Sequence, residues 1–265
     1  MSAGVDGLLS EVTEIVKAVS GLVAALAWPA IALYIFIRYH KQLGDGLSAI
    51  AGRLPQAEGL ELGPLKIALT KSADLATTIP VRPDAQDQRE AIKQQAKVGK
   101  DLRAEVVQDP SILPEIRKKM DELARQYELL RSARDAQSRL ASDAEIVQMN
   151  KVVSQMRALA LSCVPYWNDY SQSTRAGDRL AAVVIVQMSP DPKYLDWLRE
   201  RFNVDRPFVF YHAALALQNM ADQCWIEARD KIKAVSKEAM DQLRTFTGAP
   251  DKKTIDVLES ILDRP

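Results

Sequence analysis

Residues 177–188, GDRLAAVVIVQM, and residues 208–221, FVFYHAALALQNMA, decide the fold of this chain. Both stretches are apolar almost all the way round a helix, which predicts two helices that are buried on most of their surface. Between them, residues 189–192 read SPDP and form a turn, in which Asp191 is placed to cap the next helix. Residues 193–202, KYLDWLRERF, then have the spacing of an amphipathic helix.

The two apolar helices match each other at an offset of 32 residues. The matching pairs are Ala181 with Ala213, Ala182 with Ala214, and Met188 with Met220. A period in the thirties built from paired helices is typical of an α-solenoid, in which neighbouring units bury one continuous core. With Trp197 of the intervening helix, these six residues are the predicted repeat core. A short irregular helical bundle is the alternative architecture.

Residues 174–222 also resemble HEAT-type helical repeats. The resemblance is carried by Arg179-Leu180-Ala181-Ala182-Val183-Val184, followed by Asp191-Pro192 and the second helix. It implies an interaction scaffold, because such repeats usually bind proteins across an extended face and rarely catalyse reactions.

Helices are also predicted on both sides of this region, within a domain at 109–265. One follows Asp109-Pro110-Ser111, and another starts at a capping box that begins at Ser142. The aromatic stretch 165–170 interrupts the helical spacing, and we expect it to fill a corner of the core or to form a contact surface. Helical spacing returns from Trp225 to Leu243, and a last helix follows residues 248–251. Residues 71–108 are polar, which predicts a partly helical linker.

The N-terminal part contains one long uncharged stretch. Residues 18–37, AVSGLVAALAWPAIALYIFI, would span roughly 30 Å as a helix, the thickness of a bilayer's hydrocarbon core. The sequence therefore predicts a single transmembrane helix within residues 1–43, and the lipid bilayer as a partner. Its predicted span residues include Leu22, Trp28, Pro29 and Tyr34. Arg38 and Lys41 follow the span, so the N-terminus is expected outside and the C-terminal domain in the cytosol, at a bacterial inner membrane.

Two further features flank or lie within this span. Gly21 and Ala25 form a small-xxx-small pair, which predicts a helix–helix contact and a homo-oligomer. Residues 44–70 form a juxtamembrane segment, and within it residues 60–69, LELGPLKIAL, alternate apolar and polar side chains. This alternation predicts a short strand or hairpin, or a segment lying against the membrane. The expected fold class is therefore all-α, with one transmembrane helix, a short β-like segment and a helical cytosolic domain.

Composition and motifs restrict the function. The 265 residues contain 35 Lys and Arg against 35 Asp and Glu, so a strongly basic nucleic-acid-binding protein is not expected. No phosphate-binding, zinc-protease or nucleophile-elbow motif occurs, and Cys163 and His212 both lie on apolar helical faces. We therefore expect no enzyme, no cofactor and no metal site.

Two hypotheses for the function remain. The first is a membrane-anchored module that binds a cytosolic protein through its helical domain. The second is an effector that perturbs the membrane when its spans cluster, a layout that resembles membrane-tethered helical proteins of bacterial defence and stress systems.

Overall fold

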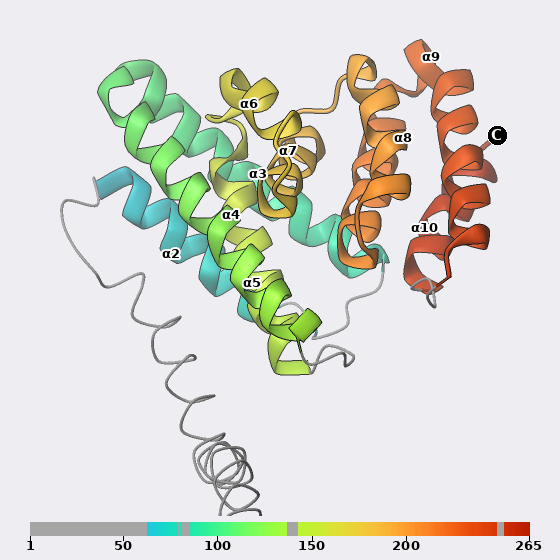
Figure 1. Ribbon diagram of the computed structural model, residues 1–265. Coiled ribbons are helices and arrows are strands. Elements are labelled where there is room, and N and C mark those ends of the chain that lie inside the picture. The colour runs from blue at the N-terminus through green and yellow to red at the C-terminus, as the bar shows by residue number, and fades with distance from the viewer. Residues whose placement is uncertain (1–62, 79, 81–84, 137–142, 248–251) are drawn as a thin grey trace, which may run out of the picture. The chain divides into compact units, whose positions relative to one another are not determined.

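The computed structural model describes residues 63–78, 80, 85–136, 143–247 and 252–265 (Figure 1). Every regular element in these residues is a helix, so the all-α expectation is confirmed and the architecture is consistent with a helical repeat domain. The α-helices are α2 (Gly63–Thr78), α3 (Ala85–Gln108), α4 (Leu113–Ala136), α5 (Asp143–Ala160), α6 (Trp167–Ser171), α7 (Ala176–Met188), α8 (Leu195–Val204), α9 (Pro207–Thr245) and α10 (Lys252–Leu262). Three short 3-10 helices are η2 (Pro110–Ile112), η3 (Val164–Tyr166) and η4 (Pro192–Tyr194).

The β-like segment predicted near residues 60–69 is wrong. Its described part lies in α2, where Leu65, Ala68, Leu69 and Ser72 are buried. These positions follow the helical spacing of three and four residues, while Ile67 of the apparent alternation is 55% exposed. Two kinds of spacing overlap in this short apolar stretch, and packing of α2 on α3 and α5 selects the helical one.

The expected fold class, which included one transmembrane helix, is also corrected. Within the described ranges no helix combines the length and the apolar character needed to cross a membrane. The strongly apolar α7 has 13 residues, which is about 20 Å, whereas the 24-residue helices α3 and α4 carry many charges. The predicted span at 18–37 and its neighbours lie outside the described residues: Leu22, Trp28, Pro29, Tyr34, Arg38, Lys41, Gly21 and Ala25.

The two apolar stretches that first suggested a repeat are α7 and the first half of α9. Ala181, Ala182, Ala213 and Ala214 have no exposed surface, and Met188 and Met220 are buried. The two helices pack against each other, and the side chain of Asn219 donates a hydrogen bond to the backbone carbonyl of Gln187. This contact joins residues 32 apart, the same offset that the sequence shows.

Helix α9 is two helices joined at a corner. The backbone leaves the helical conformation at Cys224 and Ala228, so residues 207–223 and 229–245 form separate halves. The second half runs beside α8, where Lys231 pairs with Asp196 at 2.9 Å. Both halves thus belong to a series of paired helices, although no glycine or proline marks the corner in the sequence.

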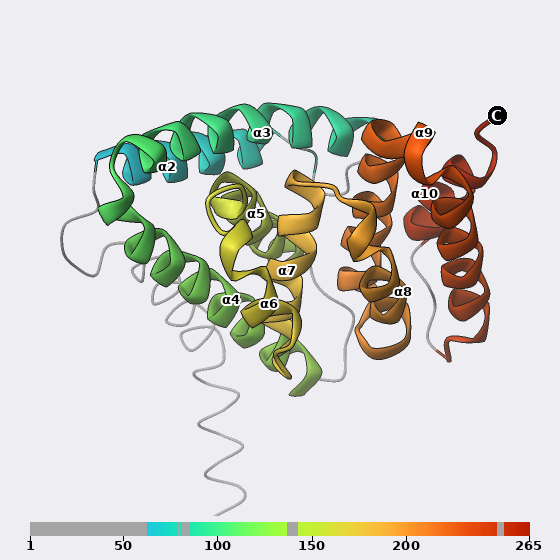
Figure 2. The same ribbon diagram turned by 90° about the horizontal axis from the view of Figure 1, so that it is seen from above.

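The helices from α5 onward form two rows. Along one row, which we call the inner row, α5 contacts α7, α7 contacts the first half of α9, and α10 packs on α9. The short helices α6 and α8 pack on the outside of α7 and α9. Helix α3 lies along the inner row, with contacts to α2, α5 and α10 (Figure 2). The polar stretch 85–108 is thus a helix packed on this array.

A glycine sets the closest approach between α4 and α7. A Cβ atom on Gly177 would lie only 2.1 Å from the backbone carbonyl oxygen of Ala124. The backbone N–H of Gly177 also donates to the Glu128 carboxylate at 2.9 Å, which satisfies a free donor in the first turn of α7. Contact between two backbones therefore positions α7 at this point.

Candidate functional site

A surface notch lies between the start of α6 and the turn η4 that precedes α8, and two similar turns build it. The turn after α5 is η3, with Pro165 in its first positions, and Trp167 follows it at the start of α6. The turn after α7 is η4, with Pro192 in its first positions, and Tyr194 ends it before α8. A proline that starts a 3-10 turn before a short outer helix therefore occurs twice, and it places two aromatic rings side by side.

The Trp167 ring packs against Tyr194, which also lines the notch, and against Trp197, which does not. The centroids of Trp167 and Tyr194 are 4.4 Å apart, and those of Trp167 and Trp197 are 5.4 Å apart in an edge-to-face arrangement. The Trp197 indole N–H donates to the backbone carbonyl of Ser171 at 3.1 Å, which ties α8 to α6. Such packing holds the aromatic side chains in place before any partner arrives.

A lysine supplies the charge at the edge of the notch. The Lys193 ammonium lies 4.8 Å from the centroid of the Tyr194 ring and pairs with the Asp191 carboxylate at 2.8 Å. Hydrogen bonds, first with Asp191 and then with Tyr194, raise the pKa of Lys193, so this group stays charged at neutral pH. Asp191 also accepts from the backbone N–H of Lys193 at 2.9 Å, which confirms its predicted capping role at η4.

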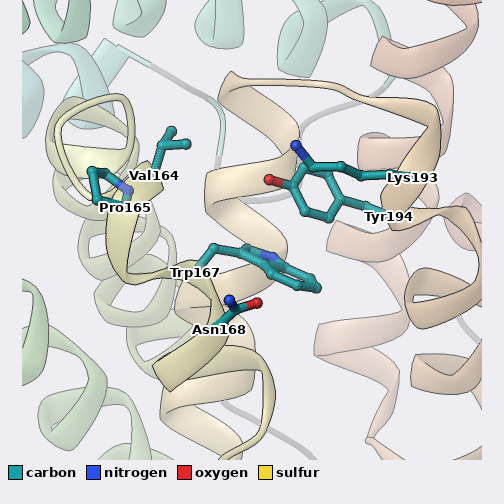
Figure 3. Close-up of a pocket in the computed structure, with 6 residues that line it drawn as sticks. All are labelled: Val164, Pro165, Trp167, Asn168, Lys193 and Tyr194. Atoms are coloured by element: carbon teal, nitrogen blue, oxygen red, sulfur yellow. The ribbon is translucent and has the colours of Figure 1, made fainter.

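The notch has a volume of about 280 Å³, enough for one or two side chains of a bound segment. Val164 and Pro165 lie on one side, Lys193 and Tyr194 lie on the other, and Trp167 and Asn168 lie between them (Figure 3). The walls are therefore apolar and aromatic, while an ammonium and a side-chain amide provide polar groups at the edge. This combination suits an apolar side chain that has a carboxylate next to it.

Sequence analysis singled out part of this site and missed the rest. For the aromatic stretch 165–170, burial of Tyr170 confirms the core-filling expectation for that residue, and the contact surface stays a prediction. Tyr170 is 4% exposed and donates to Asp121 at 2.8 Å, whereas Trp167 is half-buried beside the notch. Lys193 and Tyr194 were assigned only to an amphipathic helix. The available signal was the proline-plus-aromatic turn, which occurs at both 165–167 and 192–194.

The predicted repeat core does not line the notch, and only Trp197 contacts a residue that does, Trp167. Its alanines and methionines are buried between α7 and α9, so they stabilise the array and are not accessible to a partner. Cys163 and His212 are likewise buried, at 0% and 1% exposed. Burial raises the pKa of the Cys163 thiol to about 12, and burial and the charge of Arg157 hold the pKa of His212 well below 6.5. The thiol therefore stays protonated and the imidazole neutral at pH 7.

The described ranges contain no group of three or more His, Cys, Asp or Glu side chains arranged to hold a metal ion. Comparison with family models, with curated proteins and with solved structures finds no match for this chain. Its function is therefore inferred from the residues and their geometry alone.

Proposed function

We propose that this chain is a non-enzymatic interaction protein, in which HEAT-like helical repeats hold a partner protein at the notch between α6 and η4. The proposal rests on one observation. The half-buried Trp167 and the Tyr194 ring that packs on it line a notch bordered by the charged Lys193. Trp and Tyr are among the residues that dominate the binding energy of protein interfaces.

The repeat organisation supports this proposal. A proline-containing turn comes before both outer helices, and α7 matches the first half of α9 at the offset of 32 residues. Repeats of this kind stack into an extended row, whose outer helices and connecting turns are free to vary without disturbing the core. A binding site at two neighbouring turns can therefore vary in sequence without disturbing the core.

The expected ligand is a segment of a partner protein that carries an apolar side chain and a nearby Asp or Glu. The apolar group would fill the space beside Trp167 and Tyr194, and the carboxylate would reach the Lys193 ammonium. The Lys193 ammonium already pairs with the Asp191 carboxylate, and its remaining N–H groups can donate to a second carboxylate.

Selection from a random peptide library on the full chain tests this proposal. We expect the enriched peptides to combine an apolar residue with an acidic one. We also expect the variant Lys193→Glu to bind them at least about tenfold more weakly, because it replaces attraction by repulsion. Lys97→Glu, which reverses an exposed charge on α3, is the matched control and should leave binding unchanged. Peptides that bind the two variants equally would contradict the assignment.

The hypothesis of a membrane-perturbing effector depends on residues 18–37. These residues lie outside the described part of the chain, and no observation on the described residues favours that hypothesis. The location of the protein in the cell stays a prediction of the sequence.

A further inference from the structure

A buried arginine lies where α3 meets the inner row. Arg157 of α5 is 2% exposed, and its guanidinium binds three side-chain amides. Its Nε–H donates to Gln187 of α7 at 3.0 Å, and Nη1 donates to Gln95 of α3 at 3.0 Å. Nη1 and Nη2 share the carbonyl oxygen of Gln88, also in α3, at 3.3 and 3.4 Å.

This positive charge has no negative partner among the described residues. No ion pair within the described ranges joins Arg157 to an Asp or Glu, although carboxylates are the usual partners of buried arginines. Burial lowers the pKa of Arg157 to about 10, so the side chain is still protonated at neutral pH. Amide dipoles therefore compensate a full charge, which is weaker compensation than a carboxylate provides.

Two of the three amides belong to α3, and both lie on one face of that helix. Gln88 and Gln95 are seven residues apart, which is two helical turns, and Ala91, Ile92 and Val98 are buried with them. Gln95 also donates to the Ser154 hydroxyl of α5 at 2.7 Å. The contact between α3 and α5 is thus a narrow apolar strip interrupted by hydrogen-bonded amides.

The other side of the network, at His212, contains a ring nitrogen without a hydrogen-bond partner. The side-chain amide nitrogen of Gln187 donates to the backbone carbonyl of His212 at 2.6 Å. The same nitrogen lies 3.4 Å from the ring Nδ1 of His212. The opposite ring nitrogen, Nε2, is buried and has no hydrogen-bond partner. The inner row thus holds a charged donor, which α3 covers, and an unpartnered ring nitrogen within one buried network.

We propose that Arg157 is a carboxylate-binding site and that α3 covers it until an acidic amphipathic helix of a partner protein displaces α3. A helix with Glu at the position of Gln88 and Gln at that of Gln95 would present the same face, keep the hydrogen bond donated to Ser154 and add charge-assisted hydrogen bonds to the guanidinium. This site is separate from the notch and does not depend on its function. The ligand is identified by charge complementarity, because an anionic side chain is what the Arg157 network lacks.

A designed peptide tests the displacement. The probe is residues 85–108 as a synthetic peptide with Gln88→Glu, and the matched control is the same peptide with the native glutamine. Because α3 competes within its own chain at an effective concentration of order 1 mM, the peptides are added up to several millimolar. Hydrogen exchange is followed by mass spectrometry in full-length ¹⁵N-labelled protein, which separates the α3 amides of the protein from those of the peptide.

We expect the acidic peptide to accelerate exchange in α3 of the protein at least tenfold, with exchange in α7 unchanged. The native peptide should change α3 exchange less than twofold. Equal effects of the two peptides would overturn the proposal, since binding would then not depend on a carboxylate. Absence of any acceleration at the highest peptide concentration would overturn it as well.

Two protein variants assign the effect to Arg157. Arg157→Gln removes the charge while keeping hydrogen-bonding groups, and it should abolish the difference between the peptides. Gln88→Glu supplies the carboxylate from α3 itself, and it should reduce the acceleration at least tenfold; if Arg157→Gln does not fold, this second variant decides. An unchanged response in Gln88→Glu overturns the proposal. Lys193→Glu should respond as the wild type does, which keeps this result independent of the notch.

Discussion

The helices of the inner row are packed in two different ways, one at α7 and one where α3 meets α5. Where α7 meets α4 and α9, the contact is made by small apolar residues and by backbone, with Gly177 against Ala124 and the paired alanines at 0% exposed. Where α5 meets α3, the contact is made around Arg157 by glutamines. A larger side chain cannot be accommodated at the first contact. At the second contact, one hydrogen-bonding side chain can replace another. The first contact therefore depends on the shape of its side chains and backbone, and the second depends also on matching of hydrogen-bond donors and acceptors.

The largest expected effect tests the first contact, at α7. Gly177→Ala places a Cβ atom 2.1 Å from a backbone oxygen, so α4 and α7 must move apart. We expect the free energy of unfolding to fall by about 3 kcal/mol, measured by urea denaturation. Gly99→Ala on α3 is the matched control, because its Cβ would lie 3.4 Å from the nearest atoms of α5. It should change stability by less than about 1 kcal/mol. Equal losses would show that the two contacts do not differ.

The next prediction concerns the buried histidine of the Arg157 network. His212 is held neutral in the folded state, because burial and the Arg157 charge lower its pKa below 6.5. The unfolded chain binds a proton near pH 6.5 and the folded chain does not, so the free energy of unfolding decreases as the pH falls below 6.5. While the folded His212 stays unprotonated, the loss approaches about 1.4 kcal/mol for each further unit of pH below 6.5.

His212→Gln should remove this pH dependence, which denaturation curves at several pH values can measure. The other histidine, His40, provides the comparison variant His40→Gln. If the pH dependence disappears with His40→Gln and persists with His212→Gln, the assignment to the buried network is wrong.

A smaller effect is expected at the second contact. Gln88→Glu brings a carboxylate to both terminal nitrogens of Arg157 without changing the size of the side chain. We expect a gain of about 1.5 kcal/mol in the free energy of unfolding at pH 7, because charge-assisted hydrogen bonds replace neutral ones. Gln88→Leu should lower stability by a similar amount, since it leaves the buried donor Nη2 unpaired. A loss of stability in both variants would contradict the view that the site lacks an anion.

The smallest effect is expected at the notch. Lys193 is exposed and pairs with Asp191 at the surface, where ion pairs contribute little to stability. Lys193→Glu should therefore leave the thermal unfolding midpoint unchanged within measurement, as followed by circular dichroism. A clear decrease would mean that the notch is part of the packed structure and that its effect on peptide binding is indirect.

Much of the array could be predicted from particular residues. The apolar helices at 177–188 and 208–221 and the helix that begins at Asp143 follow from local spacing, and the cap at Asp191 follows from a side chain that bonds to neighbouring backbone. Ser142, the predicted cap of α5, lies outside the described residues. The corner at Cys224 and Ala228 could not be predicted, because neither a glycine nor a proline occurs between residues 208 and 247. Helical spacing continues across it, and packing of the second half of α9 against α8 and α10 decides where the chain turns.

The candidate sites were less accessible to sequence reasoning than the helices. Trp167 and Tyr194 are 27 residues apart, and Arg157 meets Gln88 across 69 residues. Local patterns describe neighbours within a few residues, whereas both sites require several helices to be placed together. Residues 85–108 show the limit most directly, because their polar surface resembles a linker until the buried face containing Gln88 and Gln95 is known.

The helical character of the described residues and the match between α7 and α9 could be predicted from local pattern, because apolar spacing and caps act within one or two turns. Long-range packing was needed to make residues 63–69 helical, to form a notch from two proline turns, and to place α3 over a charge that has no counter-ion among the described residues. Those features depend on free energies of burial, which are set by residues far apart in the chain and exist only when the helices are packed.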